Sequence, residues 1–432
     1  MSIERTGRRV AVVAGCRTPF CKAGTALRHM SAEHLGIIAV RELIARTGIA
    51  PEEVGELVYG TVVPSVTAPN IAREVALGAG LPPTVPAFTV SRACASANQA
   101  MTSAADIIAR GHADVVIAGG AESLSDVPVL LSQPLRQALL AASRARGTAE
   151  KLRAIKKIRP RDLLPVAPAI AEPSTGETMG ESAERMAKEN RISRDAQDRW
   201  ALRSHRLAAE GTADGRLTAE IVPVYPPPDY APAIASDNGI RVDTSLEQLS
   251  KLPPVFDRRY GTVTAGNSSP LTDGASAVLL MSEEAARARG IRPLGYIRDW
   301  AYTALAPAGQ LLLGPAYAIP LALDRAGITM RDVDLVEMHE AFSAQVLSTL
   351  QALDSNDFAR NELGRDKRVG IPDEDQINVM GGSIAIGHPF GATGARLVTT
   401  LLNELRRREG NIGLVSVCAA GGMGHAMVLE AA

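Results

Sequence analysis

The sequence has few aromatic residues, little net charge and no long apolar run. Of its 432 residues only 3% are aromatic, and 46 basic side chains are balanced by 47 acidic ones. Nucleic-acid binding is therefore disfavoured, because no overall basic field would hold a polyanion and few rings are available for base stacking. No stretch approaches the roughly 20 apolar residues of a membrane-spanning helix, and residues 1–15 lack the apolar core of a signal peptide. We expect a cytoplasmic globular protein of roughly two to three domains.

Cysteine is also scarce. The chain has 4 cysteines (Cys16, Cys21, Cys94 and Cys418), none of them in a CxxC pair. This number is too small for a disulfide framework, so we expect reduced thiols that serve packing or reactivity.

Short β-branched runs bounded by glycine alternate with Ala/Leu-rich segments of helical length, which favours an α/β fold. Residues 43–54 (LIARTGIAPEEV) are echoed by residues 322–333 (ALDRAGITMRDV). Each copy predicts the end of a helix, a glycine stop and the approach to a strand. We therefore predict two similar halves, in which Cys94 and His388 each precede a helix and could meet face to face.

Residues 122–245 interrupt this pattern with Pro-rich stretches at 165–173 and 223–232 and with a basic tract at 144–161. We predict an inserted loop or lid domain. The tract contains eight basic residues against one acid, and three apolar residues are spaced for one helical face: Leu152, Ile155 and Ile158. It is a solvated amphipathic helix, a helix that docks on a membrane surface or a partner, or a basic rim for a phosphorylated ligand.

Cys94 follows an apolar segment and precedes a helix of small residues. At that place the free N–H groups and the helix dipole would lower the pKa of a thiol, as a nucleophile requires. The alternative is that Cys94 only fills space in a core.

Three further segments carry candidate catalytic groups. His388 lies in a Gly-rich loop, where it could take the proton of the Cys94 thiol. Cys418 stands at the mouth of a predicted Gly-rich hairpin and could act as a second thiol acid/base. His339 follows a predicted strand and suits the role of a donor to a carbonyl oxygen; a zinc motif is disfavoured because position 343 is Ser. The remaining histidines in polar contexts are expected at the surface: His29, His34, His112 and His205.

Five ordered motifs resemble those of the thiolase family and span almost the whole chain: SRAC94AS, N267SSPLTDGA, H339EAF, GH388P and C418AAGG. The resemblance implies two βαβαβαββ halves in a five-layered α-β-α-β-α core. It suggests an N-terminal half at 1–121 and 246–290, an inserted loop domain at 122–245 and a C-terminal half at 291–432. His339, where most thiolases have asparagine, looks more like the β subunit of the fatty-acid oxidation complex.

The resemblance also implies roles for four side chains. Cys94 would form an acyl-thioester, and His388 would be its base and a donor to the substrate thioester oxygen. Cys418 would protonate the departing acetyl-CoA carbanion and then deprotonate the incoming CoA thiol. His339 would help to build the first oxyanion hole.

The N–H groups of Cys94 and Ala420 would form a second oxyanion hole. The family usually has glycine at the position of Ala420, and a positive φ there would cost alanine about 1 kcal/mol. Ser269 aligns with a serine that contacts CoA, and Met179 and Gly180 open a loop-domain motif near the substrate.

The implied reaction is thiolysis of 3-ketoacyl-CoA to acetyl-CoA and a shortened acyl-CoA, as in fatty-acid β-oxidation. CoA is a co-substrate, and no metal or redox cofactor is expected. Family analogy suggests a homodimer or tetramer, with a hydratase/dehydrogenase subunit as a candidate partner. The alternatives are an acetoacetyl-CoA-forming, condensing enzyme and a non-catalytic docking subunit.

Overall fold

The structure is a computed structural model that describes residues 7–156, 158–166 and 171–432. Predictions that concern residues 1–6 of the opening segment, Lys157 of the basic tract and residues 167–170 of the first Pro-rich stretch lie outside the described residues.

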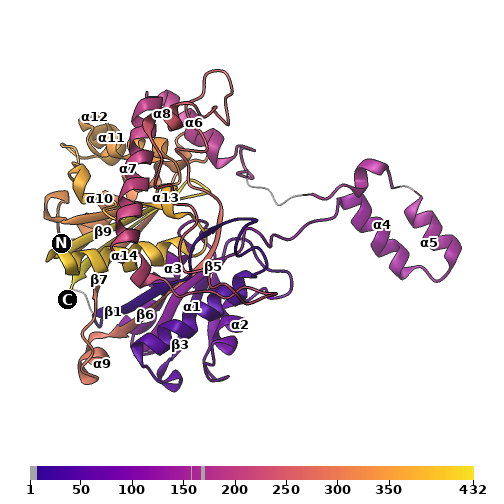
Figure 1. Ribbon diagram of the computed structural model, residues 1–432, viewed down its shortest axis with the longest axis horizontal. Coiled ribbons are helices and arrows are strands. Elements are labelled where there is room, and N and C mark those ends of the chain that lie inside the picture. Colours follow the sequence, from indigo (N-terminus) through magenta and orange to yellow (C-terminus); the bar gives the residue numbers. More distant parts are fainter. Residues whose placement is uncertain (1–6, 157, 167–170) are drawn as a thin grey trace.

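The elements of the first half recur in the second in a similar order (Figure 1). The first half contains β1 (Val10–Arg17), β2 (Cys21–Lys22), α1 (Ala32–Thr47), η1 (Pro51–Glu53), β3 (Glu56–Gly60), α2 (Ile71–Gly78), β4 (Ala87–Val90), α3 (Ser96–Ala109), β5 (Val115–Glu122), β6 (Thr272–Ser282) and α9 (Glu283–Ala288). The second half contains β7 (Gly295–Ala304), η4 (Leu311–Leu313), α10 (Gly314–Ala326), η5 (Met330–Asp332), β8 (Leu335–Met338), α11 (Ser343–Leu353), α12 (Asn356–Leu363), η6 (Glu374–Gln376), α13 (Ser383–Ile386), α14 (Thr393–Arg408), β9 (Ile412–Ala419) and β10 (Met423–Ala431).

The predicted repeat is confirmed at its glycines. Gly48 ends α1 with φ 65° and Gly327 ends α10 with φ 67°, both in the left-handed conformation that suits glycine. After each glycine the chain enters a 3-10 turn and then a strand, β3 or β8.

The strands follow the order β4-β3-β5-β6-β1-β7-β10-β9-β8, with β2 paired to β6. The series β3-β5-β6-β1 is thus mirrored by β8-β9-β10-β7. In each half the first pair is parallel and the remaining pairs are antiparallel. A short antiparallel pairing of Val10–Val12 with β7 joins the two halves.

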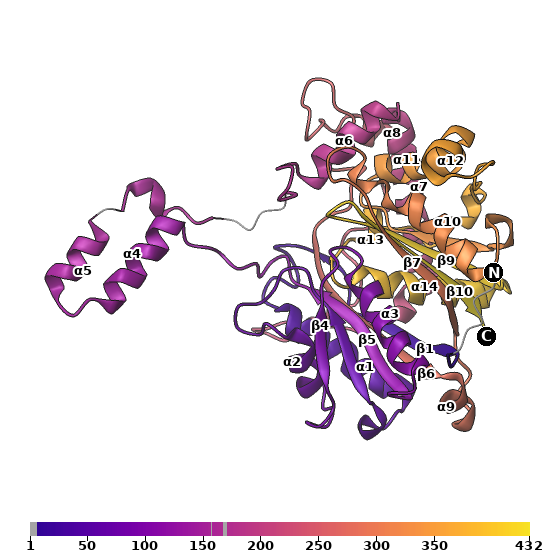
Figure 2. The same cartoon turned by 180° about the vertical axis from the view of Figure 1, so that it is seen from behind.

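Alternating side chains separate the layers, as the two faces of a strand require. In β6, Val278 and Leu280 face a central core shared with α3 and α14, whereas Leu279 and Met281 face α1 and α2. In β10, Met427 faces the central core and neighbouring residues face α10. The two half-sheets therefore enclose α3 and α14 and carry further helices outside, which confirms the five-layered α/β fold (Figure 2).

The two central helices approach each other closely at their starts. A β-carbon on Gly394 of α14 would lie 2.0 Å from Asn98 Oδ1 of α3, so no other residue fits there without displacement. This approach brings the segments before the two helices, which carry Cys94 and His388, to the same place.

The chain between the paired strands β5 and β6 holds the additional elements α4 (Gln133–Arg144), α5 (Thr148–Ile155), η2 (Pro160–Leu163), α6 (Met179–Glu189), α7 (Arg194–Ala213), η3 (Thr218–Glu220) and α8 (Leu246–Ser250). Helices α6 to α8 lie on the body, whereas α4 and α5 form a hairpin that projects far from it (Figures 1 and 2). In the part of the chain that the structure describes, we find no helix that combines the length and the apolar character needed to cross a bilayer.

Candidate active site

Cys94 lies in the turn between β4 and α3. Ala93 directly before it has φ 45°, a left-handed conformation that costs an alanine roughly 1–2 kcal/mol. The Ser96 hydroxyl holds this turn, because it accepts from the Arg92 N–H at 2.8 Å and donates to the Ala93 carbonyl at 2.7 Å. The strained turn presents the half-buried Cys94 side chain just before the helix begins.

His388 lies in the equivalent turn before α14. Gly387, with φ 112°, turns the chain so that the His388 N–H donates to the Pro270 carbonyl at 3.3 Å. The buried ring has Nδ1 at 2.6 Å from Thr393 Oγ1, and its Nε2 meets no hydrogen-bond partner among the described residues. The Nε2 atom is therefore the one available to a substrate or to a thiol.

His339 follows β8 and completes a cluster with the two residues above. Its Nδ1 lies 2.8 Å from Ser383 Oγ, and its buried Nε2 finds no partner in the described chain. The ring centroids of His339 and His388 are 4.0 Å apart. One thiol or imidazole atom from each of Cys94, His339 and His388 lies within 4.8 Å of the others. The structure thus brings together three of the residues that the sequence predicted for the site. Zinc accepts thiol and imidazole ligands of this kind, so the expectation that the reaction needs no metal stays a prediction.

Cys418 is buried near the end of β9, in the hairpin that the sequence predicted, opposite Gly424 of β10. Burial, followed by the negative charge that Cys94 would carry as a thiolate, raises the pKa of Cys418 well above its usual value. The two thiols therefore lie within electrostatic reach of each other.

The backbone N–H groups of Ala420 and Cys94 both act on the Cys94 sulfur. Ala420 does not have the positive φ that would strain an alanine; Gly421 and Gly422 carry the left-handed turn instead, with φ 85° and 71°. The Gly421 N–H donates to Glu172 at 2.9 Å, which fixes the turn to the inserted segment. Alanine is therefore compatible with the proposed oxyanion hole.

The predicted lowering of the Cys94 pKa is wrong in its net direction. Burial raises the pKa of Cys94 to about 11, and the N–H groups of Ala420 and Cys94 only partly offset this effect. Burial also lowers the pKa of His388 to about 3. Before substrate arrives, the pair is therefore a neutral thiol beside a neutral imidazole, because charge is costly on either group.

The segment that contains Ser269 runs beside both histidine loops. The Ser269 N–H donates to the Ala341 carbonyl at 2.9 Å, and Leu271 forms an isolated parallel β-bridge with His388. Met179 packs against the apolar cluster that includes Cys418. Gly180 has a packing role, since a β-carbon there would lie 1.8 Å from the Phe256 ring.

Glu122 was missed by the sequence analysis. It is buried at the end of β5 and accepts from the N–H groups of Val62, Val63 and Gly391 at 2.9–3.0 Å. Gly391 belongs to the His388 loop, so Glu122 ties the two halves together beside the site. Burial raises its pKa to about 7. A carboxylate at a strand end was the only available signal.

A second missed group lies behind His339. Glu340 is buried and accepts from Trp200 Nε1, Ser204 Oγ and Asn378 Nδ2 at 2.7–3.0 Å, which anchors the His339 loop. His205, expected at the surface, is in fact buried: its Nδ1 accepts from the Arg241 N–H at 3.2 Å, and burial lowers its pKa to about 4. Polar flanking residues in the sequence concealed its packing.

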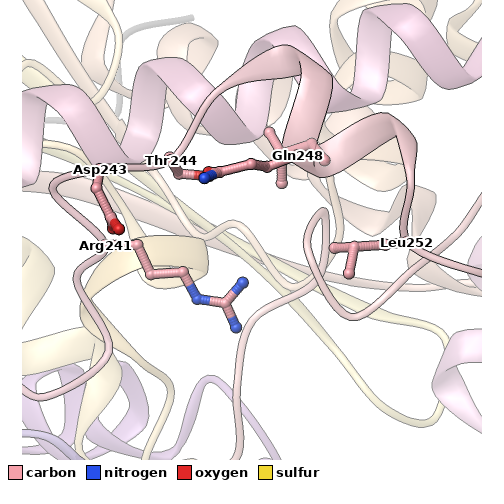
Figure 3. A pocket seen from close by; sticks show the side chains of 6 residues that line it. Arg241, Asp243, Thr244, Gln248 and Leu252 are labelled. Atoms are coloured by element: carbon pink, nitrogen blue, oxygen red, sulfur yellow. The ribbon is translucent and has the colours of Figure 1, made fainter.

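A pocket of about 260 Å³ opens beside this histidine, with the Arg241 guanidinium directed into it (Figure 3); its lining is Arg241, Asp243, Thr244, Gln248, Leu249 and Leu252. The neighbouring Gly239 lies against α13, because a β-carbon there would be 2.5 Å from the Ala385 carbonyl. The pocket lining therefore begins two residues after a segment that packs on α13, the helix that leads to His388, and it includes none of the three clustered residues.

Comparisons with known proteins agree with this architecture. The family models described as "Thiolase, N-terminal domain" and "Thiolase, C-terminal domain" match residues 10–284 and 291–431. The chain is 53% identical over 428 residues to proteins named 3-ketoacyl-CoA thiolase from Yersinia pestis and Yersinia pseudotuberculosis, with 99% of this chain and 98% of each relative covered.

Solved structures are similar over nearly the full length. The Bacillus anthracis acetyl-CoA acetyltransferase matches with a TM-score of 0.86 and 33% identity, covering 99% of both chains. The human mitochondrial 3-ketoacyl-CoA thiolase matches with a TM-score of 0.84 and 32% identity, covering 98% of this chain and 99% of that one.

Proposed function

The chain belongs to the thiolase family of acyltransferases, and from that premise we propose that it cleaves 3-ketoacyl-CoA with free CoA, giving acetyl-CoA and a shortened acyl-CoA in fatty-acid β-oxidation. The observation that carries this proposal is the cluster of one thiol and two imidazoles, with both buried Nε2 atoms unpartnered in the described chain. The 53% identity to 3-ketoacyl-CoA thiolases supports the choice of substrate.

In the first half-reaction, the Cys94 thiol gives its proton to Nε2 of His388 as sulfur adds to the ketone carbon of the substrate. The Cα–Cβ bond then breaks, and its electron pair moves onto the thioester to form the acetyl-CoA enolate. Cys418 protonates the enolate carbon. Acyl-Cys94, acetyl-CoA and a Cys418 thiolate result.

In the second half-reaction, the Cys418 thiolate takes the proton of the incoming CoA thiol. The CoA sulfur adds to the acyl carbon, the bond to Cys94 breaks, and the thiolate of Cys94 recovers the proton held by His388. Shortened acyl-CoA leaves. Each thiol therefore returns to its starting protonation state.

Two groups of donors would stabilise the negative oxygens. The Nε2–H groups of His339 and protonated His388 would hold the thioester oxygen of the departing acetyl-CoA. The N–H groups of Cys94 and Ala420 would hold the oxygen on the carbon bound to Cys94, in keeping with their action on its sulfur.

The direct test mixes the purified chain with CoA and a series of 3-ketoacyl-CoA substrates, and follows loss of the enolate absorbance. We expect consumption of at least one chain length and none with the Cys94→Ser variant. No consumption at any chain length would overturn the proposal.

A condensing thiolase is the main competing function, because the same residues run the reaction in either direction and a solved acetyl-CoA acetyltransferase is also similar. Rates of acetoacetyl-CoA formation and of long-chain thiolysis separate the two. Consumption of acetoacetyl-CoA only, with ready condensation of acetyl-CoA, would favour the alternative. A docking subunit would instead retain its cellular role in the Cys94→Ser variant.

For CoA we propose contacts with Ser269 and Met179, and with Arg241, whose guanidinium suits an anionic phosphate. We expect Arg241→Ala to raise the KM for CoA about tenfold with a smaller change in kcat, and Arg287→Ala, a distant exposed cation, to leave both unchanged. An unaltered KM for CoA in Arg241→Ala would exclude this contact.

The projecting α4–α5 hairpin suggests a docking role, and we propose an anionic lipid surface as its target. Exposed apolar side chains, among them Leu140 at 51% and Leu152 at 70% exposure, accompany the basic residues Lys151, Arg153 and Lys156. Apolar insertion combined with cationic attraction is how amphipathic helices bind anionic membranes.

Vesicle co-sedimentation tests this role. Replacing Lys151 and Arg153 by Glu should abolish binding to vesicles that contain anionic lipid, whereas two equivalent reversals at Arg287 and Arg292 should retain it. Absence of wild-type binding at low salt would exclude the lipid target; retention of a hydratase/dehydrogenase subunit by the hairpin would identify a protein partner instead.

We further propose that the protein is a cytoplasmic homodimer or tetramer. We propose domain boundaries at residues 121, 245 and 290. We also propose that the reaction requires neither a metal nor a redox cofactor. Light scattering would measure the assembly, with a monomer as the contrary result. Prolonged dialysis against a chelator should leave thiolysis unchanged; a loss restored by added zinc would overturn the metal-free mechanism.

A further inference from the structure

A network of buried polar groups begins at the Nδ1 atom of the His339 ring. The Ser383 hydroxyl is 2.8 Å from Nδ1 of His339, and an amino group of Arg396 donates to the same hydroxyl oxygen at 3.4 Å. Arg396 is held in turn by Glu337, with 3.0 Å between Nη1 and Oε2. All four residues are at most 1% exposed, although they come from β8, its following loop, α13 and α14.

In this polar network only one placement of the hydrogen atoms gives both the oxygen and the hydroxyl proton of Ser383 a partner. Arginine has donors only, so the Ser383 oxygen accepts from Arg396 and the hydroxyl proton needs another acceptor. Within the described chain, Nδ1 of His339 is the only other side-chain polar atom bonded to that hydroxyl. Ser383 therefore donates to Nδ1, which must carry a lone pair. In a neutral imidazole the proton is then on Nε2.

We propose that Ser383, oriented by Arg396, is a positioning residue that fixes His339 in the Nε2–H tautomer and so makes it a permanent hydrogen-bond donor toward the thioester oxygen of the substrate. This inference rests on the proposed function, because that function supplies the oxygen to which the Nε2–H group points. The tautomer of His339 also gives a reason why His339 would act as a donor while the neighbouring His388 would act as a base.

His388 has a different neighbour behind its ring. Thr393 Oγ1 lies 2.6 Å from Nδ1 of His388 and can also donate to the Pro389 carbonyl, 3.3 Å away. When it does so, its oxygen accepts from the Nδ1–H of His388, and Nε2 retains the lone pair that a base needs. Ser383 has no such carbonyl acceptor among the hydrogen bonds of the described chain. At the start of the catalytic cycle, Nε2 of His339 can thus be a hydrogen-bond donor while Nε2 of the adjacent His388 is an acceptor.

The tautomer of His339 can be measured in the unmodified protein. Long-range ¹H–¹⁵N spectra of protein labelled at its 7 histidines distinguish protonated from unprotonated ring nitrogens, and His339→Asn identifies the relevant signals. We expect a protonated Nε2 and an unprotonated Nδ1. A proton on Nδ1 of His339 would overturn the inference without any variant of Ser383.

Kinetics provide the second test. Ser383→Ala should lower kcat for carbon–carbon cleavage about tenfold, because an oxyanion donor is loosened rather than removed, while KM changes little. Exchange of labelled CoA into a saturated acyl-CoA uses only the acyl-Cys94 half-reaction and should stay within twofold of wild type. Ser383→Thr keeps the hydroxyl and should recover most of the cleavage rate. Ser348→Ala, which removes a buried hydroxyl on α11 with no partner in the described chain, is the matched control.

The outcomes separate this inference from the proposed function. Equal losses in cleavage and exchange would indicate a general structural defect and overturn the positioning role. If His339→Ala impairs cleavage but Ser383→Ala does not, the positioning role of Ser383 is wrong and the proposed role of His339 stands. If wild-type protein cleaves no 3-ketoacyl-CoA, the proposed function fails, while the spectra still decide the tautomer.

Discussion

The two halves of the molecule place different chemistry at equivalent positions. In the first half, Ala93 takes a strained left-handed conformation to present a half-buried thiol before α3. In the second, Gly387 turns the chain without that strain and places a buried imidazole before α14. The duplicated fold thus explains why two reactive side chains meet, whereas local residues explain why one is a thiol, the proposed nucleophile, and the other an imidazole, its proposed base.

The largest effect should come from removing Cys94, the proposed nucleophile of the first half. Cys94→Ser keeps the shape of the side chain but replaces the thiol with a much less acidic hydroxyl, so we expect thiolysis to fall by at least about 10⁴-fold. Cys16→Ser is the control, because the Cys16 thiol is buried in the outer core and donates to the Ala39 carbonyl. Thiolysis within tenfold of wild type in Cys94→Ser would exclude Cys94 as the nucleophile.

Removing the second thiol should have the next largest effect. Cys418→Ala deletes the proposed acid that protonates the acetyl-CoA enolate and the proposed base that activates CoA, and a loss of about 10²–10⁴-fold in kcat is expected for such a group. Alkylation of Cys94 by iodoacetamide should persist, as peptide mass mapping would show. Unchanged kcat would mean that another group transfers these protons.

Exchanging the residues that precede Cys94 and His388 tests the comparison itself. Gly387→Ala forces a β-carbon to φ 112° and to 2.5 Å from Thr272 Cγ2, so we expect a loss of about 1–3 kcal/mol in the free energy of unfolding, measured with denaturant. Ala93→Gly should change stability by less than about 1 kcal/mol, because relief of strain is offset by the entropy of glycine in the unfolded chain. Equal effects at both positions would show that the two turns are not strained differently.

The last expected effect concerns the pH dependence of stability and the link between the halves. Burial raises the pKa of Glu122 from 4.5 to about 7, so the folded protein binds more protons than the unfolded chain between these values. Its contribution to the free energy of unfolding is therefore fully present below pH 4.5 and is lost as pH rises through about 7. Glu122→Gln should flatten this dependence in denaturant titrations from pH 5 to 8. Glu284→Gln, at an exposed position, should retain the wild-type slope, and an equal slope in Glu122→Gln would contradict the assignment.

Local patterns in the sequence predicted much of this arrangement. The echo of residues 43–54 at 322–333 indicated the duplication, and the positions of Cys94 and His388 before helices indicated their meeting. These features are short-range, and glycine stops and helix starts are written in neighbouring residues. The roles of Cys94, His388, Cys418 and His339 remain predictions until the variants are measured.

The groups behind the site could not be predicted in the same way. Glu337, Ser383 and Arg396 are far apart in the sequence and meet only after β8, α13 and α14 have packed. The upward shift of the Cys94 pKa likewise depends on burial, which the helix-start position alone does not reveal. His205 was misassigned for the same reason, since its packing comes from other segments of the chain.

Mass spectrometry of an acyl-enzyme tests the central claim most directly. After brief incubation with a 3-ketoacyl-CoA in the absence of free CoA, the peptide that contains Cys94 should gain the mass of the shortened acyl group and lose it when CoA is added. An acyl group found on Cys418 instead, or no adduct on either thiol in a preparation that turns over once CoA is added, would contradict the account.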